Sequence, residues 1–248
     1  MTATIARQIH AYYDDTYLTD ASATVVAAGT DEEGPWAAVS PNIFHPKGGG
    51  QPSDEGTLDG APIVPARADG LVVLHGAPAP EVGASVQCHV DQGLRRRHAA
   101  LHTAGHVLGH LGEARGWTHS GHSHFPGQAR LDFDPAGHEE ELATPELRES
   151  VRAELQAQMD AVLARGGQVS ASVDGSGHRT VTIEGVNAEP CGGTHVRSLA
   201  DLTGVRILEV KVKRGAIKVR YEAEHAGPGA SPGADPGAEA EAPQGGAA

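Results

Sequence analysis

The chain has 248 residues, a formal net charge of −13 and two cysteines, Cys88 and Cys191. This length allows one large domain or two modest ones, and the acidic balance argues against a protein that coats nucleic acid by bulk charge. Two distant cysteines exclude a disulfide framework, and the sequence shows neither an apolar run of about 18 residues nor a secretory leader. We therefore expect a cytoplasmic protein without a membrane partner.

Residues 1–90 are predicted to form a small β-barrel-like domain. Short apolar stretches at residues 23–28, 36–39 and 71–74 are bounded by clusters of Gly, Pro and Asp, which is typical of a barrel or a sandwich. Residues 44–56 contain too many glycines and prolines for the interior of a strand, so we expect a loop there.

Residues 91–225 are predicted to form a second, α/β domain with an antiparallel sheet, which places the whole chain in the α+β class. Leucine and valine recur near a 3.6-residue period between residues 94 and 113, and this pattern predicts a helix. A histidine-rich loop that contains His119, His122 and His124 should follow, and after it a strand at residues 129–133.

A second helix is predicted for residues 145–164. Thr144 can cap its first turn, Pro145 occupies the first helical position, and Gly166 and Gly167 end it. The apolar stripe of this helix should face a core, and it consists of Val151, Leu155, Met159 and Val162.

Strands and a tail are predicted for the rest of the chain. Two strands at residues 168–173 and 179–184 precede a hairpin with arms at 205–213 and 216–222. Residues 226–248 are almost only Gly, Ala, Pro and acidic residues, so we expect a disordered tail. The alternation in the hairpin predicts that one face meets a core through Val210, Val212, Ile217 and Val219.

Four histidines in the first predicted helix are spaced four residues apart. Four residues turn an α-helix by about 400°, so neighbours in this series lie about 40° apart on one face. Each adjacent pair could bind one metal ion, and spacing alone leaves three pairs open. The histidines are His98, His102, His106 and His110.

Cys191 and His195 stand four residues apart, with two glycines between them. With imidazoles from the helix they would form a nitrogen-rich tetrahedral set that suits zinc. The helix lacks the Glu that zinc peptidases carry beside their first His, and the chain lacks the Pro-Cys-x-x-Cys of nucleobase deaminases. A purely structural zinc site and a merely polar helix face remain alternatives.

Several segments of the chain resemble motifs of one family. Residues 102–106, His-Thr-Ala-Gly-His, and residues 191–195, Cys-Gly-Gly-Thr-His, resemble the two zinc motifs of the alanyl-tRNA synthetase editing domain. Residues 48–56 resemble the glycine-rich motif of that family, and residues 130–133 resemble the strand that follows its zinc helix. The likeness covers roughly residues 5–225, so the chain is similar to the longer AlaX proteins, which are free-standing editing proteins.

The resemblance implies a zinc-containing editing domain that hydrolyses the ester bond of tRNA(Ala) wrongly charged with serine or glycine. The family recognises the acceptor end of the tRNA. Carried over to this chain, the Zn²⁺ ligands fall on His102, His106, Cys191 and His195, and Gly48, Gly49, Gly50 and Gln51 would shape the site or meet the tRNA end. Gln51 and Thr103 are the predicted catalytic residues.

Departures from the family pattern concern the choice of substrate. The glycine-rich motif begins with His45-Pro46-Lys47 instead of Tyr-Pro-Glu, and Gly105 stands where a larger residue is common. The histidine-rich segment lies where the family shapes its amino-acid pocket. Thr103 is predicted to hydrogen-bond a seryl hydroxyl, and the alternative is that its hydroxyl bonds to the backbone of its own helix.

Two groups of cations are predicted to bind the tRNA despite the overall negative charge. Arg95, Arg96 and Arg97 stand just before the histidines of the first helix, and Lys211 and Lys213 share one face of the predicted hairpin. The alternative is that both groups are ordinary solvated faces.

Two other functions compete with editing. The same site could transfer the aminoacyl group to a small-molecule acceptor, or the chain could be a zinc-stabilised RNA-binding module without turnover. Four protein ligands leave zinc no vacant tetrahedral position, so the ion would expand its coordination, lose a ligand or act by positioning. The sequence does not predict an oligomeric state.

Overall fold

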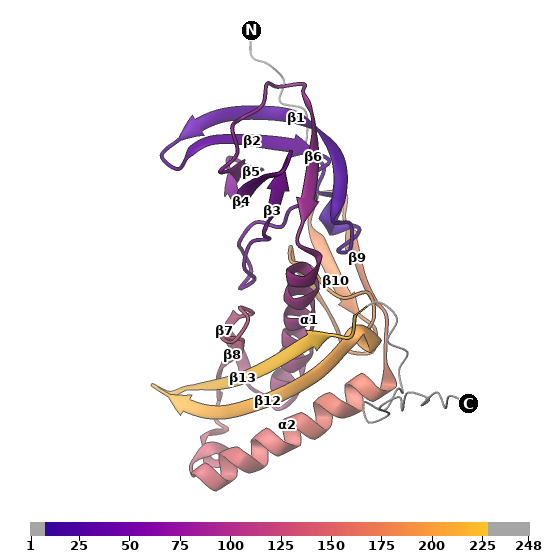
Figure 1. Cartoon of the computed structure of the whole chain (residues 1–248). Helices are drawn as coiled ribbons and strands as arrows, with labels where there is room; N and C mark the ends of the chain where they lie inside the picture. The colour runs from indigo at the N-terminus through magenta and orange to yellow at the C-terminus, as the bar shows by residue number, and fades with distance from the viewer. Residues whose placement is uncertain (1–7, 228–248) are drawn as a thin grey trace, which may run out of the picture.

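The computed structural model describes residues 8–227, and the first part of this range is a closed antiparallel barrel (Figure 1). The order of its strands is β1-β2-β5-β4-β3-β6. The alternation of inward and outward residues is clear in β6, where Val86, Cys88 and Val90 are buried and their neighbours are exposed. The strands are β1 Asp20–Asp31, β2 Gly34–Ser40, β3 Gly56–Leu58, β4 Ala61–Ala68, β5 Leu71–His75 and β6 Ser85–Val90.

The glycine-rich segment forms a loop between β2 and β3, as its composition predicted. Gly48 and Gln51 exchange two backbone hydrogen bonds of 3.0 and 3.1 Å. Gly49 and Gly50 between them have φ angles of 55° and 71°. Positive φ at both central residues is the geometry of a type I′ turn, which glycine adopts at little steric cost.

Helix α1, Gln92–Ala114, leaves the barrel directly after β6 (Figure 1). The carboxylate of Asp91 caps the helix by accepting a hydrogen bond of 2.8 Å from the Leu94 N–H. The helix confirms the prediction from the 3.6-residue pattern. Its buried apolar side chains join the second hydrophobic core, which is separate from that of the barrel.

A four-stranded antiparallel sheet of order β12-β13-β8-β7 packs against α1 (Figure 1). The predicted strand near residue 130 and the predicted hairpin are confirmed, and Arg214 and Gly215 form the hairpin turn with positive φ angles. Val212 near this turn is 44% exposed, so its predicted place in the core was wrong: the hairpin extends beyond the core there. The strands are β7 Thr118–Ser123, β8 Arg130–Asp134, β12 Leu202–Lys213 and β13 Ala216–His225.

Strand β7 corrects the prediction of a histidine-rich loop. His119 pairs with Phe133 and His122 pairs with Leu131 of β8. A register shift between His119 and Gly121 interrupts this ladder. Residues of β7 are exposed or half-buried throughout, so the strand lacks the apolar alternation by which sequence analysis finds strands.

Helix α2, Pro145–Arg165, lies along β12 (Figure 1). Thr144 accepts a hydrogen bond from the Leu147 N–H, and the helix ends at Gly166 with φ 70°. Its four predicted core residues are all buried. The cap, the first position and the end of this helix therefore agree with the prediction.

A three-stranded sheet of order β11-β10-β9 completes the fold. Its strands are β9 Val169–Val173, β10 Arg179–Ile183 and β11 Asn187–Pro190. Cys191 follows β11 directly. Short 3-10 helices lie at Ala11–Tyr13, Glu139–Leu142 and Leu199–Asp201.

Between residues 8 and 227, no helix is long and apolar enough to cross a membrane. The predicted tail at residues 226–248 lies almost wholly outside the described residues. The division of the chain into domains at residue 90 stays a prediction, although the barrel strands and the rest of the fold bury separate apolar cores.

Candidate metal centre

Four side chains converge where α1 meets the segment after β11. His102 and His106 stand one turn apart on α1, and Cys191 and His195 lie on the segment that runs past them. One ligand atom of each residue lies within 4.8 Å of all the others. Of the three histidine pairs that spacing left open, the fold therefore brings His102 and His106 to the cysteine motif.

Two of the distances in this cluster match those around a zinc ion. Sγ of Cys191 lies 3.5 Å from Nε2 of His102 and 3.3 Å from Nε2 of His195. Zinc bonds of about 2.0–2.3 Å in a tetrahedron separate neighbouring ligand atoms by about 3.3–3.6 Å. The donor set of one thiol and three imidazoles is also one that zinc accepts.

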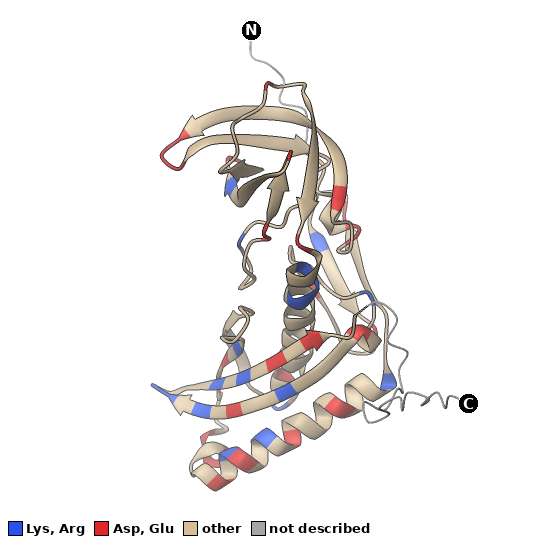
Figure 2. Cartoon of the chain, in the orientation of Figure 1, with Lys and Arg blue, Asp and Glu red and all other residues tan. Residues whose placement is uncertain are grey.

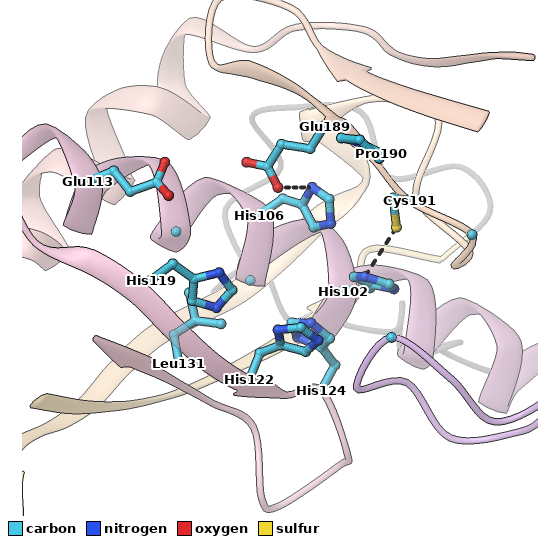
Figure 3. A pocket seen from close by; sticks show the side chains of 14 residues that line it. His102, His106, Glu113, His119, His122, His124, Leu131, Glu189, Pro190 and Cys191 are labelled. Carbon is cyan, nitrogen blue, oxygen red and sulfur yellow. Dashed lines mark hydrogen bonds and ion pairs between the residues drawn. The ribbon is translucent and has the colours of Figure 1, made fainter. Parts of the chain in front are cut away.

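The second nitrogen of each histidine faces a partner outside the cluster. Nδ1 of His102 lies 2.8 Å from Oε1 of Gln51, and Nδ1 of His195 lies 3.1 Å from Oγ1 of Thr103. Nδ1 of His106 lies 3.5 Å from a carboxylate oxygen of Glu189 (Figure 3). The hydrogen-bonding partners of His102 and His195 hold the proton on Nδ1 and leave Nε2 to bind a metal, which is the usual arrangement around ligand histidines. Nδ1 of His106 makes no hydrogen bond among the described residues, and Glu189 is its nearest charged neighbour.

The protonation states also suit metal binding. Burial lowers the pKa of His102 and of His195 well below the ordinary value, and it lowers the pKa of His106 to about 4. All three imidazoles are therefore neutral at pH 7. Burial raises the pKa of the Cys191 thiol, while the Gly193 N–H opposes this shift, so a bound cation would have to displace the thiol proton.

Gln51 connects the glycine-rich loop to both zinc motifs. Its side chain is completely buried, and besides His102 it contacts Thr194 twice. Nε2 of Gln51 donates to Oγ1 of Thr194 at 2.8 Å, and its Oε1 accepts from the Thr194 N–H at 3.0 Å. With these contacts Gln51 joins the glycine-rich loop to the first zinc motif at His102 and to the second at Thr194.

Thr103 faces away from the cavity beside the metal centre. Besides its contact with Nδ1 of His195, its hydroxyl accepts a hydrogen bond of 3.2 Å from the Val196 N–H. Successive helical residues are rotated by about 100°, so Thr103 cannot share the face of His102. The structure thus does not support the predicted contact between Thr103 and a seryl hydroxyl.

A cavity of about 300 Å³ opens beside the four converging side chains (Figure 3). Leu131 and Pro190 are its only apolar side chains among the described residues, whereas imidazoles and carboxylates dominate the lining. Sequence analysis missed Glu113 and Glu189, although Glu113 stands two helical turns after His106 and so on the same face. The lining includes His102, His106, Glu113, His119, His122, His124, Leu131 and Glu189.

The predicted tRNA contact of Arg95 requires correction. Arg95 is completely buried, its Nε donates to Oδ1 of Asp54 at 2.9 Å, and its Nη1 donates to the carbonyl oxygen of Thr16 at 2.8 Å. A guanidinium that is enclosed in this way has no access to a tRNA. Its ion pair with Asp54 instead joins α1 to the loop between β2 and β3.

The other predicted cations lie outside the cavity. Arg96 and Arg97 line a separate hollow with Glu224 and His225. Lys211 and Lys213 are exposed on β12, the strand of the sheet farthest from β7, and Nζ of Lys211 lies 2.6 Å from Oε1 of Glu209. Figure 2 shows basic and acidic residues interspersed along β12, β13 and α2.

Comparison with known proteins relates this chain to tRNA editing. The "Threonyl and Alanyl tRNA synthetase second additional domain" matches residues 178–226. The alanyl-tRNA editing protein AlaX-M of Methanosarcina mazei is 30% identical, over 82% of this chain and 90% of its own length. AlaX-M of Pyrococcus horikoshii is 28% identical, over 83% of this chain and 91% of its own length.

The chain belongs to the AlaX family. It also matches the alanine–tRNA ligase of Methanopyrus kandleri at 29% identity over 87% of the chain, but it spans only 26% of that ligase. The domain match includes Cys191 and His195 and leaves out the helix with the other two histidines. In this AlaX-family chain the tertiary structure, rather than the matched segment alone, assembles the four donors.

Proposed function

We propose that this AlaX-family protein is a trans-editing hydrolase that deacylates mischarged tRNA(Ala) in the cytoplasm, with serine or glycine as the amino acid removed. Zn²⁺ is the proposed cofactor, and the acceptor end of the tRNA is the proposed partner. The observation that carries the proposal is the convergence of His102, His106, Cys191 and His195 beside a polar cavity. The names of the AlaX-M relatives support the substrate.

The chemistry of the site suits an aminoacyl ester. A zinc ion held by the four donors would act as a Lewis acid toward the ester carbonyl or a water. Gln51 and Thr103 hold the imidazoles of His102 and His195 in the orientation that this requires. Their proposed contribution to catalysis is therefore positioning.

We propose that the tRNA 3′ end binds at the glycine-rich loop. Gly49 lines the cavity, and the absence of side chains at Gly48, Gly49 and Gly50 lets a nucleotide approach the backbone. Arg67 supplies a cation here: its guanidinium lies 3.7 Å from the place where a Cβ atom on Gly48 would sit. We also propose that Arg96, Arg97, Lys211 and Lys213 contact the tRNA farther from the ester.

The first test measures ester loss from tRNA(Ala) charged separately with serine, glycine and alanine. We expect the zinc-loaded protein to release serine or glycine well above the spontaneous rate and to spare alanine. The double variant His102→Ala/Cys191→Ala should lose both its zinc and this activity. Spontaneous rates for all three substrates with the zinc-loaded protein would refute the hydrolase.

The same assay separates the competing functions. An aminoacyl transferase would release the amino acid only when an amine or hydroxyl acceptor is added, and an RNA-binding module would bind tRNA without any release. The departure at His45 does not favour the transferase, because His45 is buried beneath the loop and burial lowers its pKa to about 4. His45 also does not line the cavity.

A further inference from the structure

The polar side chains of the two predicted catalytic residues, Thr103 and Gln51, are already hydrogen-bonded within the protein. The hydroxyl of Thr103 is bound to His195 and Val196, and the amide of Gln51 is bound to His102 and Thr194. A cavity that recognises a hydroxylated amino acid must present some other hydrogen-bonding atom near the metal centre.

His124 has its tautomer fixed by two consecutive hydrogen bonds. Its Nδ1 lies 2.6 Å from the hydroxyl oxygen of Tyr221, and that hydroxyl donates to the carbonyl oxygen of Leu101 at 3.0 Å. A tyrosine hydroxyl has one proton, which is used for Leu101, so it must accept the Nδ1–H of His124. Nε2 of His124 is therefore an unprotonated acceptor.

This acceptor belongs to the cavity beside the metal centre. The ring of His124 stacks on the ring of His102 with centroids 4.4 Å apart and on the ring of His122 with centroids 5.2 Å apart (Figure 3). His124 lines the cavity, and its Nε2 has no hydrogen-bond partner among residues 8–227. A ligand that entered the cavity could thus supply the missing donor.

Two glycines make the space that His124 occupies. A Cβ atom on Gly105 would lie 2.5 Å from Cε1 of His124 and 2.6 Å from the hydroxyl oxygen of Tyr221. A Cβ atom on Gly50 would lie 3.1 Å from Cδ2 of His124. Gly105, which departs from the family pattern, is therefore what allows the histidine to lie against α1.

We propose that Nε2 of His124 accepts a hydrogen bond from the side-chain hydroxyl of the aminoacyl group, and that Tyr221 and Gly105 position it for this purpose. The inference rests on the proposed function and names the atom that selects the substrate. A seryl group satisfies this acceptor. An alanyl group, or a 2-aminobutyryl group of nearly the same shape as seryl, leaves it unpaired in a partly closed site, which costs binding free energy.

The test measures binding rather than turnover. Adenosine that carries seryl, alanyl or 2-aminobutyryl through a 3′-amide cannot be hydrolysed, and titration calorimetry with the zinc-loaded full chain gives its Kd. We expect the native protein to bind the seryl amide about tenfold or more tightly than the 2-aminobutyryl amide. His124→Leu should reduce the ratio of the two Kd values, 2-aminobutyryl over seryl, to about one. His124→Gln keeps a hydrogen-bond acceptor and should retain part of this preference.

Two further variants separate selection from a structural role. Tyr221→Phe removes the group that fixes the tautomer, so it should lower the ratio while zinc content stays the same. His110→Leu removes an imidazole of α1 that does not line the cavity and should leave the ratio unchanged. An unchanged ratio in His124→Leu, or the absence of any preference in the native protein, would overturn the inference. Failure of the proposed function would show instead as spontaneous rates of ester loss from charged tRNA(Ala).

Discussion

Gly193 has no room for a side chain, because a Cβ atom there would lie 2.1 Å from Cε1 of His102. A side chain at this position would force the imidazole of His102 to shift. Gly192 is different, since its added Cβ would meet nothing closer than 3.5 Å, at the hydroxyl oxygen of Tyr13. A methyl group is therefore excluded sterically at Gly193 but fits at Gly192, and this difference supplies a matched pair of variants.

Gly193→Ala should weaken zinc binding, because the new methyl group would push the imidazole of His102 out of place. Disturbance of a ligand's orientation typically costs about 10–100-fold in metal affinity. We expect a loss in this range, measured by competition with a chromophoric chelator. Gly192→Ala is the control and should bind zinc almost as the native protein does. Equal affinities for all three proteins would contradict the assigned role of Gly193.

The buried histidines should make the metal-free protein sensitive to acid. Burial lowers the pKa of His45 and of His106 from the ordinary 6.5 to about 4. Between pH 6.5 and about 4 these two histidines are protonated in the unfolded chain but remain neutral in the folded chain. The free energy of unfolding therefore falls as the pH is lowered through this window, and below pH 4 these two groups change it little. The free energy of unfolding from urea titrations should drop by a few kcal/mol between pH 7 and 4.5. His45→Gln should flatten this dependence, and an unchanged pH dependence in that variant would count against the role of His45.

Among the elements, the two helices were predicted well because their apolar residues follow a local period. Strand β7 was missed because its residues are exposed or half-buried and lack apolar alternation, so the pairing with β8 leaves no local pattern in the sequence. Strand β4 also went unpredicted. It contains Pro62 and Pro65, which normally argue against a strand interior.

Helix α2 offers a test at the scale of the element. Leu155 is completely buried where α2 packs on β12, so Leu155→Ala should destabilise the fold by about 2–5 kcal/mol. Urea unfolding followed by circular dichroism would measure this change. Glu149→Ala on the exposed side is the control and should change the unfolding free energy by roughly 0.5 kcal/mol or less. A similar effect of the two substitutions would show that α2 is not anchored through this stripe.

In the whole molecule, one buried ion pair joins the barrel to the rest of the fold. Arg95 of α1 and Asp54 of the glycine-rich segment are both without side-chain exposure. Asp54 also accepts a hydrogen bond from the His45 N–H. The pair therefore holds the loop that carries Gln51 against the helix that carries His102, so the position of the metal centre depends on it.

Removal of one partner of the Arg95–Asp54 ion pair should destabilise the fold more than removal of both partners. Arg95→Met leaves the Asp54 carboxylate buried without its counter-ion and should cost about 3–5 kcal/mol of unfolding free energy. The double variant Arg95→Met/Asp54→Leu should recover much of this loss, because no unpaired charge remains. Urea titrations of both single variants and the double variant give the coupling. Additive effects would mean that the two side chains act independently.

The sequence by itself determined the α+β class, both helices with their ends, the barrel strands with apolar runs and the residue types able to bind zinc. These features depend on local periods and short motifs. Helical spacing left three histidine pairs open, and the resemblance of two short motifs pointed to His102 and His106. Only the tertiary structure brought these two to Cys191, turned Thr103 away from the cavity, buried Arg95 and placed His124 beside the metal centre. Each of these outcomes is a contact between segments far apart in the chain, such as Gln51 with His102 or His124 with Tyr221, and no local pattern encodes such a contact.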